Sequence, residues 1–89
     1  MSKISKNKEL NDMQIHIEKA YEIIAAHLPA IYVSFVIDKL KTKGITNVSS
    51  SMIRNVKNQT NLRHDVLLAL VEVAKENEQT INELKTLTA

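Results

Sequence analysis

The chain has 89 residues, of which 44% are hydrophobic and 25% charged, with one glycine, one proline and no cysteine. This is the length and composition of a single globular domain, and the lack of cysteine excludes disulfides, thiolate metal sites and a cysteine nucleophile. The N-terminus is polar and basic, and no stretch approaches the ~20 apolar residues that span a bilayer. We therefore expect a cytoplasmic protein.

The N-terminal half of the sequence predicts a flexible arm and two helices. Residues 1–8 contain three lysines, and we expect a flexible basic arm there, ahead of one helical domain over residues 9–89. Apolar residues at spacings of three and four then predict an amphipathic helix over roughly 9–28. They are Leu10, Met13, Ile17, Ala20, Tyr21, Ile24 and Leu28. Pro29 suits the opening turn of a second helix over about 30–42. Its inward residues are Val33, Val36, Ile37 and Leu40.

The C-terminal half predicts a short helix and a long one. Gly44 is the expected stop of the second helix. The next helix covers about 50–57, and its candidate N-caps are Ser49, Ser50 and Ser51. Its inward residues are Met52, Ile53 and Val56. The last helix runs from about 62 to 87 with the core stripe Leu62, Val66, Ala69, Leu70, Val73 and Ala74. The expected fold class is all-α, a compact bundle of about four helices that contains a helix-turn-helix and a long C-terminal helix.

Positive charge is concentrated in the middle of the chain, although the net charge is only +2. Between Asp38 and Asp65 there is no acidic residue, and the cations there are Lys39, Lys41, Lys43, Arg54, Lys57 and Arg63. Such segregation is typical of a surface that binds a polyanion. If four to six of these cations contact phosphates, log K falls against log salt with a slope of about −4 to −5. The alternative is a chance gap in acids on a solvated surface.

The short helix has residue types suited to contacting a DNA duplex. Its outward side supplies the predicted base contacts Ser50, Ser51, Arg54 and Asn55. Arginine pairs with guanine O6 and N7, and asparagine pairs with adenine N6 and N7. Contacts to the DNA backbone set the register without discriminating sequence, and those predicted are Lys39, Lys41, Lys43, Ser49, Lys57, Asn58, Thr60 and Arg63. The start of the last helix, around Asn61 and Leu62, is a further candidate phosphate site. The alternative is an ordinary polar face of a surface helix.

Three segments carry a resemblance to a known family. Residues 33–40, 48–58 and 61–70 read VSFVIDKL, VSSSMIRNVKN and NLRHDVLLAL. Together they resemble the lambda-repressor/Cro-type helix-turn-helix, in particular the small phage- or mobile-element-like regulators of bacteria. The resemblance covers roughly residues 30–75, with a connection between the two helices that is longer than the tight turn of the family. It implies a DNA-binding domain that sits on its operator as a dimer, with Ser50, Ser51, Arg54 and Asn55 on the recognition helix.

We therefore expect a sequence-specific DNA-binding protein, a transcriptional regulator that reads the major groove with the helix at about 50–57, and a homodimer. The alternative is a non-DNA helical protein–protein interaction module, antitoxin-like or anti-repressor. It would bind through Ile31, Tyr32 and Phe35 or through a C-terminal seam. That seam comprises Val66, Leu70, Val73, Asn77, Thr80, Leu84 and Leu87. It is either a short dimer interface whose register Asn77 fixes, or a frayed helix end.

No enzyme activity is expected. The three histidines share no ligand spacing, and the serine run has neither a base partner nor a glycine-rich elbow. The acidic pairs on the helices have no nearby group that would tune them for proton transfer. We expect no catalytic residue, metal, cofactor, small-molecule substrate or membrane partner.

Overall fold

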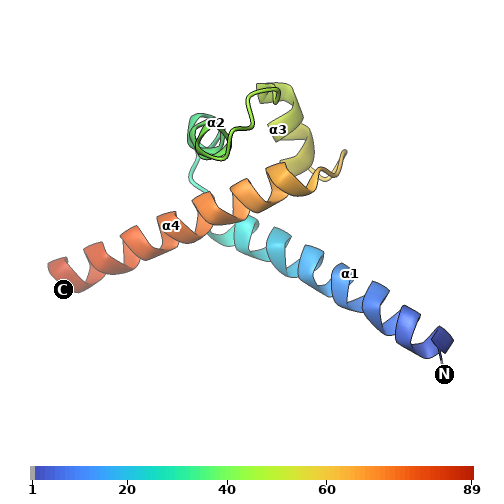
Figure 1. Ribbon diagram of the computed structural model, residues 1–89. Coiled ribbons are helices and arrows are strands. Elements are labelled where there is room, and N and C mark those ends of the chain that lie inside the picture. Colours follow the sequence, from blue (N-terminus) through green and yellow to red (C-terminus); the bar gives the residue numbers. More distant parts are fainter. Residues whose placement is uncertain (1) are drawn as a thin grey trace.

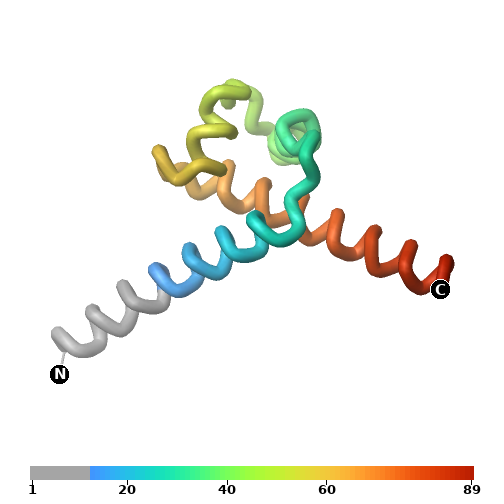
Figure 2. Tube along the Cα trace, turned by 180° about the vertical axis from the view of Figure 1, so that it is seen from behind, coloured from blue at the N-terminus to red at the C-terminus, as the bar shows by residue number. Residues whose placement is uncertain are grey.

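Four helices make up the computed structural model, which describes the backbone of residues 2–89 and the side chains of residues 13–89. They are α1 (Ser2–His27), α2 (Val33–Thr42), α3 (Ser50–Lys57) and α4 (His64–Thr88). α4 contacts each of the other three. α2 and α3 lie together on one side of α4, and α1 crosses it on the other side (Figure 1, Figure 2). The all-α class, the four helices and the long C-terminal helix expected from the sequence are confirmed.

α1 begins at Ser2, so residues 2–8 belong to this helix, where a flexible basic arm ahead of a helix starting near residue 9 was expected. The inward position of Leu10 stays a prediction, because this residue falls outside those whose side chains the structure describes. Within the described part of the chain, no helix combines the length and the apolar character needed to cross a membrane.

The core is the apolar stripe of α4, surrounded by the inner faces of the other helices. The stripe consists of Val66, Leu67, Ala69, Leu70, Val73 and Ala74, all buried. Against it pack Ile24 of α1, Val36 and Leu40 of α2, and Ile53 and Val56 of α3. Isolated helices as short as α2 and α3 are marginal in water. Their apolar contacts with α4 therefore supply most of their stability.

Two helices begin later than the sequence pattern suggested. α2 begins at Val33 instead of near residue 30, because Pro29 and the residues after it form an irregular connection and Tyr32 is the N-cap. The carbonyl of Tyr32 accepts the first bond of the helix from the N–H of Val36 at 2.9 Å. α4 begins at His64 instead of at Leu62. The apolar pattern locates the buried face of a helix, but not its first residue.

Two residues expected in the core are exposed. Leu62 precedes α4 and remains exposed, whereas Leu67, one helical turn into α4, is buried. Met13 is also exposed. It lies before Ile17, which is the first residue of the predicted α1 stripe, among those whose side chains are described, to pack on the core. Both expectations were wrong for the same reason: helical spacing extends past the point where a second helix covers the face.

Gly44 ends α2 as expected. Its φ of +78° lies in the left-handed region, which glycine enters without a steric penalty. The N–H of Gly44 donates to the carbonyl of Lys41 at 2.9 Å, and the N–H of Ile45 donates to the carbonyl of Leu40 at 2.8 Å. This is the Schellman arrangement, in which carbonyls of the last turn gain partners. Ile45 also packs against the core, which fixes the direction of the chain toward α3.

α4 continues well past the core. Its last buried residue is Ala74, Asn77 and Glu78 are half-buried, and every residue from 79 to 89 is exposed. In both views this segment extends away from the other helices (Figure 1, Figure 2). The radius of gyration is accordingly 15.5 Å, against about 12 Å for a spherical domain of this length.

Candidate nucleic-acid interface

A serine cap fixes the start of α3. Ser49 has extended backbone angles (φ −87°, ψ 162°), and its hydroxyl oxygen accepts from the N–H of Met52 at 3.2 Å. Of the three candidate caps, Ser49 is therefore the one that caps the helix. Its hydroxyl hydrogen stays available to donate outward, since a hydroxyl both accepts and donates.

Packing and one long-range hydrogen bond hold α3 in place. Ile53 and Val56 are completely buried against the other helices. The hydroxyl of Tyr21 in α1 donates to the carbonyl of Val56 at 2.8 Å. Burial of this phenol raises the pKa of Tyr21 above its ordinary value. α3 is thus oriented by α1 as well as by α2 and α4.

The outward face of α3 carries three of the four predicted base contacts. Ser51, Arg54 and Asn55 are exposed, whereas Ser50 is half-buried at the edge of the packed face. At 100° per residue, these three and Asn58 fall within an arc of about 100°, opposite Ile53 and Val56. Arg54 and Asn55 make no side-chain hydrogen bond or ion pair with the residues whose side chains are described. Their donors and acceptors are free to meet a ligand.

The turn after α3 folds back onto that helix. Gln59 has a φ of 64°, a left-handed conformation that residues other than glycine rarely adopt. The backbone N–H and the hydroxyl of Thr60 both donate to the carbonyl of Asn55 at 3.0 Å. The ammonium of Lys57 lies 5.9 Å from the ring centre of Tyr32. Lys57, Asn58 and Thr60, all predicted backbone contacts, therefore surround the C-terminal end of α3.

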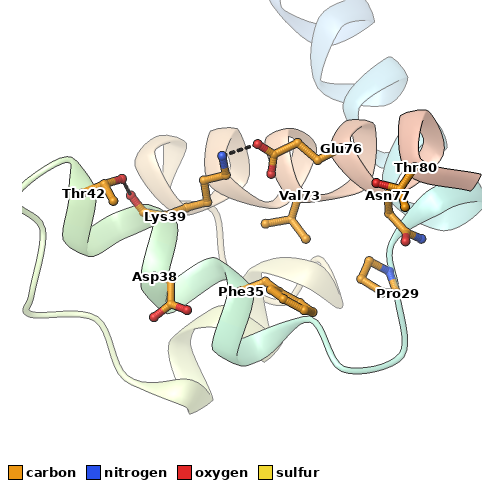
Figure 3. A pocket seen from close by; sticks show the side chains of 9 residues that line it. All are labelled: Pro29, Phe35, Asp38, Lys39, Thr42, Val73, Glu76, Asn77 and Thr80. Carbon is orange, nitrogen blue, oxygen red and sulfur yellow. Dashed lines mark hydrogen bonds and ion pairs between the residues drawn. The ribbon is translucent and has the colours of Figure 1, made fainter. Parts of the chain in front are cut away.

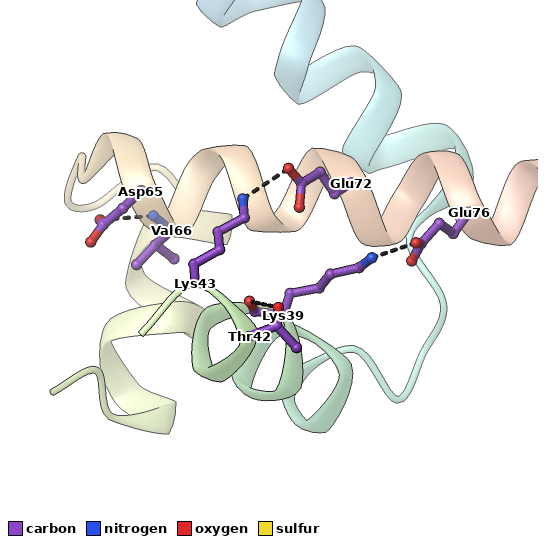
Figure 4. A network of polar contacts seen from close by, with 7 residues as sticks. All are labelled: Lys39, Thr42, Lys43, Asp65, Val66, Glu72 and Glu76. Carbon is purple, nitrogen blue, oxygen red and sulfur yellow. Dashed lines mark hydrogen bonds and ion pairs between the residues drawn. The ribbon is translucent and has the colours of Figure 1, made fainter. Parts of the chain in front are cut away.

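Two of the predicted backbone lysines are paired with acids of α4. The ammonium of Lys43 lies 2.8 Å from the carboxylate of Glu72, and Lys39 pairs with Glu76 one turn further along (Figure 3, Figure 4). The hydrogen bond to Glu76 raises the pKa of Lys39. The stretch without acids in the sequence is therefore not free of acids in space. Lys41, on the same helix, is exposed and has no carboxylate partner among the described side chains.

Arg63 is also held within the chain. Its Nε lies 2.9 Å from the carboxylate of Asp65, and its Nη2 donates to the amide oxygen of Asn47 at 3.4 Å. The same Asp65 oxygen accepts from the N–H of Val66 at 2.8 Å in the first turn of α4. A negative side chain is favourable at this end of the helix dipole. The expected phosphate site at the start of α4 is thus filled by a carboxylate of the chain, and the N–H of Leu62 is taken by the side chain of Asn61.

The sequence contains a signal for the two lysine–glutamate pairs. Lys39 on α2 and Lys43 at the C-cap of this helix are four residues apart, and Glu72 and Glu76 are four apart on α4. Residues four apart lie on one helix face. Two such pairs of opposite charge on helices that pack together predict a ladder of ion pairs.

No family model, curated protein or solved structure matches this chain. The resemblance to lambda-repressor/Cro-type regulators stays an interpretation of the sequence. The function is therefore inferred from the residues of the chain and their geometry.

Proposed function

We propose that this protein binds DNA in a sequence-specific manner as a transcriptional regulator, with α3 inserted in the major groove. The observation that supports this most is the composition of the outward face of α3. Ser51, Arg54 and Asn55 lie together, exposed and uncommitted, opposite an apolar face that three helices hold. A helix with its side chains is about 10–12 Å across, which fits a major groove about 12 Å wide.

Each of these side chains has a distinct role in the proposal. Arg54 donates two hydrogen bonds to guanine O6 and N7, and Asn55 pairs with adenine N6 and N7. Ser51 contacts either a base edge or a phosphate. Ser50 is the least suited of the predicted base contacts, because it is half-buried at the edge of the packed face.

The contacts to the DNA backbone come from groups beside α3 that are not engaged by acids. Lys41 and Lys57 supply charge, and the hydroxyl of Ser49 and the side-chain amide of Asn58 supply donors. The hydroxyl of Thr60, also a predicted backbone contact, already donates to the carbonyl of Asn55 and has no hydrogen left for a phosphate. Lys39, Lys43 and Arg63 are partnered by Glu76, Glu72 and Asp65. They contribute less net affinity, since a phosphate would have to displace a carboxylate. Because Arg54 is assigned to a base, Lys41 and Lys57 are the two of the six central cations that remain for phosphates, and the expected salt slope falls to about −2 per bound chain.

The test is fluorescence anisotropy of a labelled random-sequence duplex titrated with the protein over a series of salt concentrations. We expect binding that weakens with salt at about the slope given above for one chain, or about twice that for a bound dimer. A protein that leaves the anisotropy unchanged at the lowest salt, or that binds with a salt-independent affinity, would contradict the proposal.

A protein-binding module is the second candidate, and one observation favours it. Ile31 is 74% exposed and Phe35 is 53% exposed, so the aromatic surface that such a module would use is not buried in the bundle. Tyr32 is half-buried. If Ile31→Ala and Phe35→Ala leave DNA affinity unchanged while Arg54→Ala lowers it, this surface is separate from DNA binding. Absence of any DNA binding by the wild type would favour the second candidate.

The homodimer expected from the sequence belongs to the first proposal, because two half-sites on one duplex double the base contacts. The dimer interface must lie outside α3, because α3 contacts the DNA in this proposal.

A further inference from the structure

The exposed half of α4 keeps an apolar face. Ile81, Leu84 and Leu87 are 40%, 54% and 82% exposed. At helical spacing they continue the face that buries Leu70 and Val73 in the core. A helix segment with no tertiary packing is only marginally stable in water. Covering this apolar face would therefore stabilise the segment.

A groove adjoins that face between α2 and α4. Its volume is about 480 Å³, and its walls include Pro29, Phe35, Val73, Asn77 and Thr80 (Figure 3). The amide nitrogen of Asn77 donates to the carbonyl of His27 at 2.7 Å, so one of its two hydrogens is engaged within the chain. The role of Asn77 as the register-fixing residue of a seam stays a prediction. The Phe35 ring is the largest apolar group on the groove wall.

The size of the apolar patch corresponds to one half of a standard dimer interface. The exposed fractions of Phe35, Ile81, Leu84 and Leu87 together exceed two whole side chains. At about 200 Å² for a large side chain this is on the order of 450 Å² of apolar surface. A standard interface buries roughly 800 Å² on each partner, and about 56% of that is nonpolar. The patch thus supplies the apolar part of one such interface.

The order along α4 of the groove and of the exposed apolar stripe (Ile81, Leu84 and Leu87) favours a second copy of this chain as the occupant of the groove. The groove lies beside residues 73–80 and the stripe covers 81–87, with Thr80 at the boundary. If two α4 helices pair antiparallel about a twofold axis at Thr80, Leu87 of each copy lies level with Val73 of the other. Leu84 then lies level with Glu76, beside the wall that contains Phe35. A twofold interface requires a patch that is complementary to itself, and a stripe next to a groove meets this condition.

We propose that two copies of this chain associate in this way, through the C-terminal half of α4 and the groove between α2 and α4. Charges at the edges do not set this direction, because Glu83 of one copy lies level with Asn77 of the other and Lys85 lies level with Lys75. The direction follows from the order of the groove and the exposed apolar residues along α4.

The first test is the molar mass in solution, by light scattering and sedimentation over a concentration series. The variant is Leu84→Glu, and its matched control is Leu68→Glu. Both leucines lie on α4 and are 54% exposed, but Leu68 lies on the opposite side of the helix from the stripe. We expect the wild type and the control to be dimers and the Leu84 variant to be a monomer with unchanged helix content by circular dichroism. A monomeric wild type, or a Leu84 variant that dimerises as the wild type does, would overturn the proposal.

The second test measures the direction of pairing by disulfide formation, which is clean because the chain has no cysteine. Thr80→Cys places two thiols near the twofold axis, and we expect an intermolecular disulfide on mild oxidation. Thr88→Cys is the control. In the antiparallel pair its two copies are about 24 Å apart along the axis, too far for a disulfide, which needs Cα atoms about 4.4–6.8 Å apart. Crosslinking of both variants would indicate a parallel pair, and crosslinking of neither would contradict the interface.

The inference extends the dimer of the proposed function, but its tests measure mass and crosslinking and not DNA binding. The two proposals can therefore fail separately. A dimer that binds no DNA would leave the α4 interface intact, and a monomer that binds DNA would leave the α3 surface intact.

Discussion

Replacing Tyr21 with phenylalanine removes a hydrogen bond that joins α1 to the last turn of α3. The hydroxyl donates to the carbonyl of Val56 at 2.8 Å. That carbonyl also accepts from the N–H of Gln59 at 3.1 Å, so it keeps one partner after the substitution. The cost is therefore that of one net hydrogen bond, about 1 kcal/mol, and not the larger cost of an orphaned carbonyl. For a chain of this length the same loss lowers Tm by roughly 5 °C.

Urea unfolding followed by circular dichroism measures this loss, and Tyr32→Phe is the matched control. The chain has two tyrosines, and the hydroxyl of Tyr32 makes no hydrogen bond with the described side chains or backbone. We expect the control to change stability by less than about 0.5 kcal/mol. Equal effects of the two substitutions, or no effect of Tyr21→Phe, would refute the role assigned to this bond.

The same tyrosine predicts a dependence on alkaline pH. Burial raises the pKa of Tyr21 above its ordinary value of 10.0, so the folded chain holds the phenol proton more tightly than the unfolded chain does. The resulting stability is complete below pH 10 and is lost as the pH rises through the folded pKa. Tyr21→Phe should therefore lose less stability than the wild type above pH 10.

Three further predictions concern the turns and the lysines. Gln59→Gly should raise the free energy of unfolding by about 0.5–1 kcal/mol, because glycine relieves the φ of 64°, whereas its neighbour Asn58→Gly, at a φ of −86°, should lower it. Gly44→Ala should lower the free energy of unfolding by about 1 kcal/mol through the φ of +78° alone, since nothing lies within 4 Å of the added Cβ. Thermal unfolding of the Gln59, Asn58 and Gly44 variants measures these changes. Lys41→Ala should weaken DNA binding in low-salt anisotropy more than Lys39→Ala, whose ammonium Glu76 already holds. Equal losses of DNA affinity in the two lysine variants would show that the ion pair with Glu76 does not reduce the contribution of Lys39 to binding.

The features that could be predicted from the sequence depend on neighbouring residues. The bounds of α3 at 50 and 57 were predicted from a serine cap and a polar break, and the structure confirms both. The stop at Gly44 follows from one residue type that tolerates a left-handed backbone. The buried faces of α3 and α4 follow from helical spacing. Each of these signals is contained within about two turns of chain.

The features that were missed depend on contacts between distant residues. Lys39 and Glu76 are separated by 37 positions, and Lys43 and Glu72 by 29. The absence of acids between Asp38 and Asp65 in the sequence therefore did not predict which acids pack beside these lysines. Asn77 lies at a seam position of the sequence, but it satisfies a carbonyl of α1, 50 residues earlier. Such pairings are fixed by how the helices cross, which spacing along one helix does not reveal.

The most direct measurement of the central claim is the ratio of affinities for a duplex selected from a random pool and for a scrambled duplex of the same length. It should be made on the wild type, on Arg54→Ala and on Arg63→Ala, which removes the other arginine of the chain. We predict that Arg54→Ala lowers the ratio by roughly 5- to 150-fold, the equivalent of one lost bidentate contact, while Arg63→Ala leaves it near the wild-type value. A wild type without preference, or an Arg54 variant that keeps the wild-type ratio, would contradict the role assigned to α3.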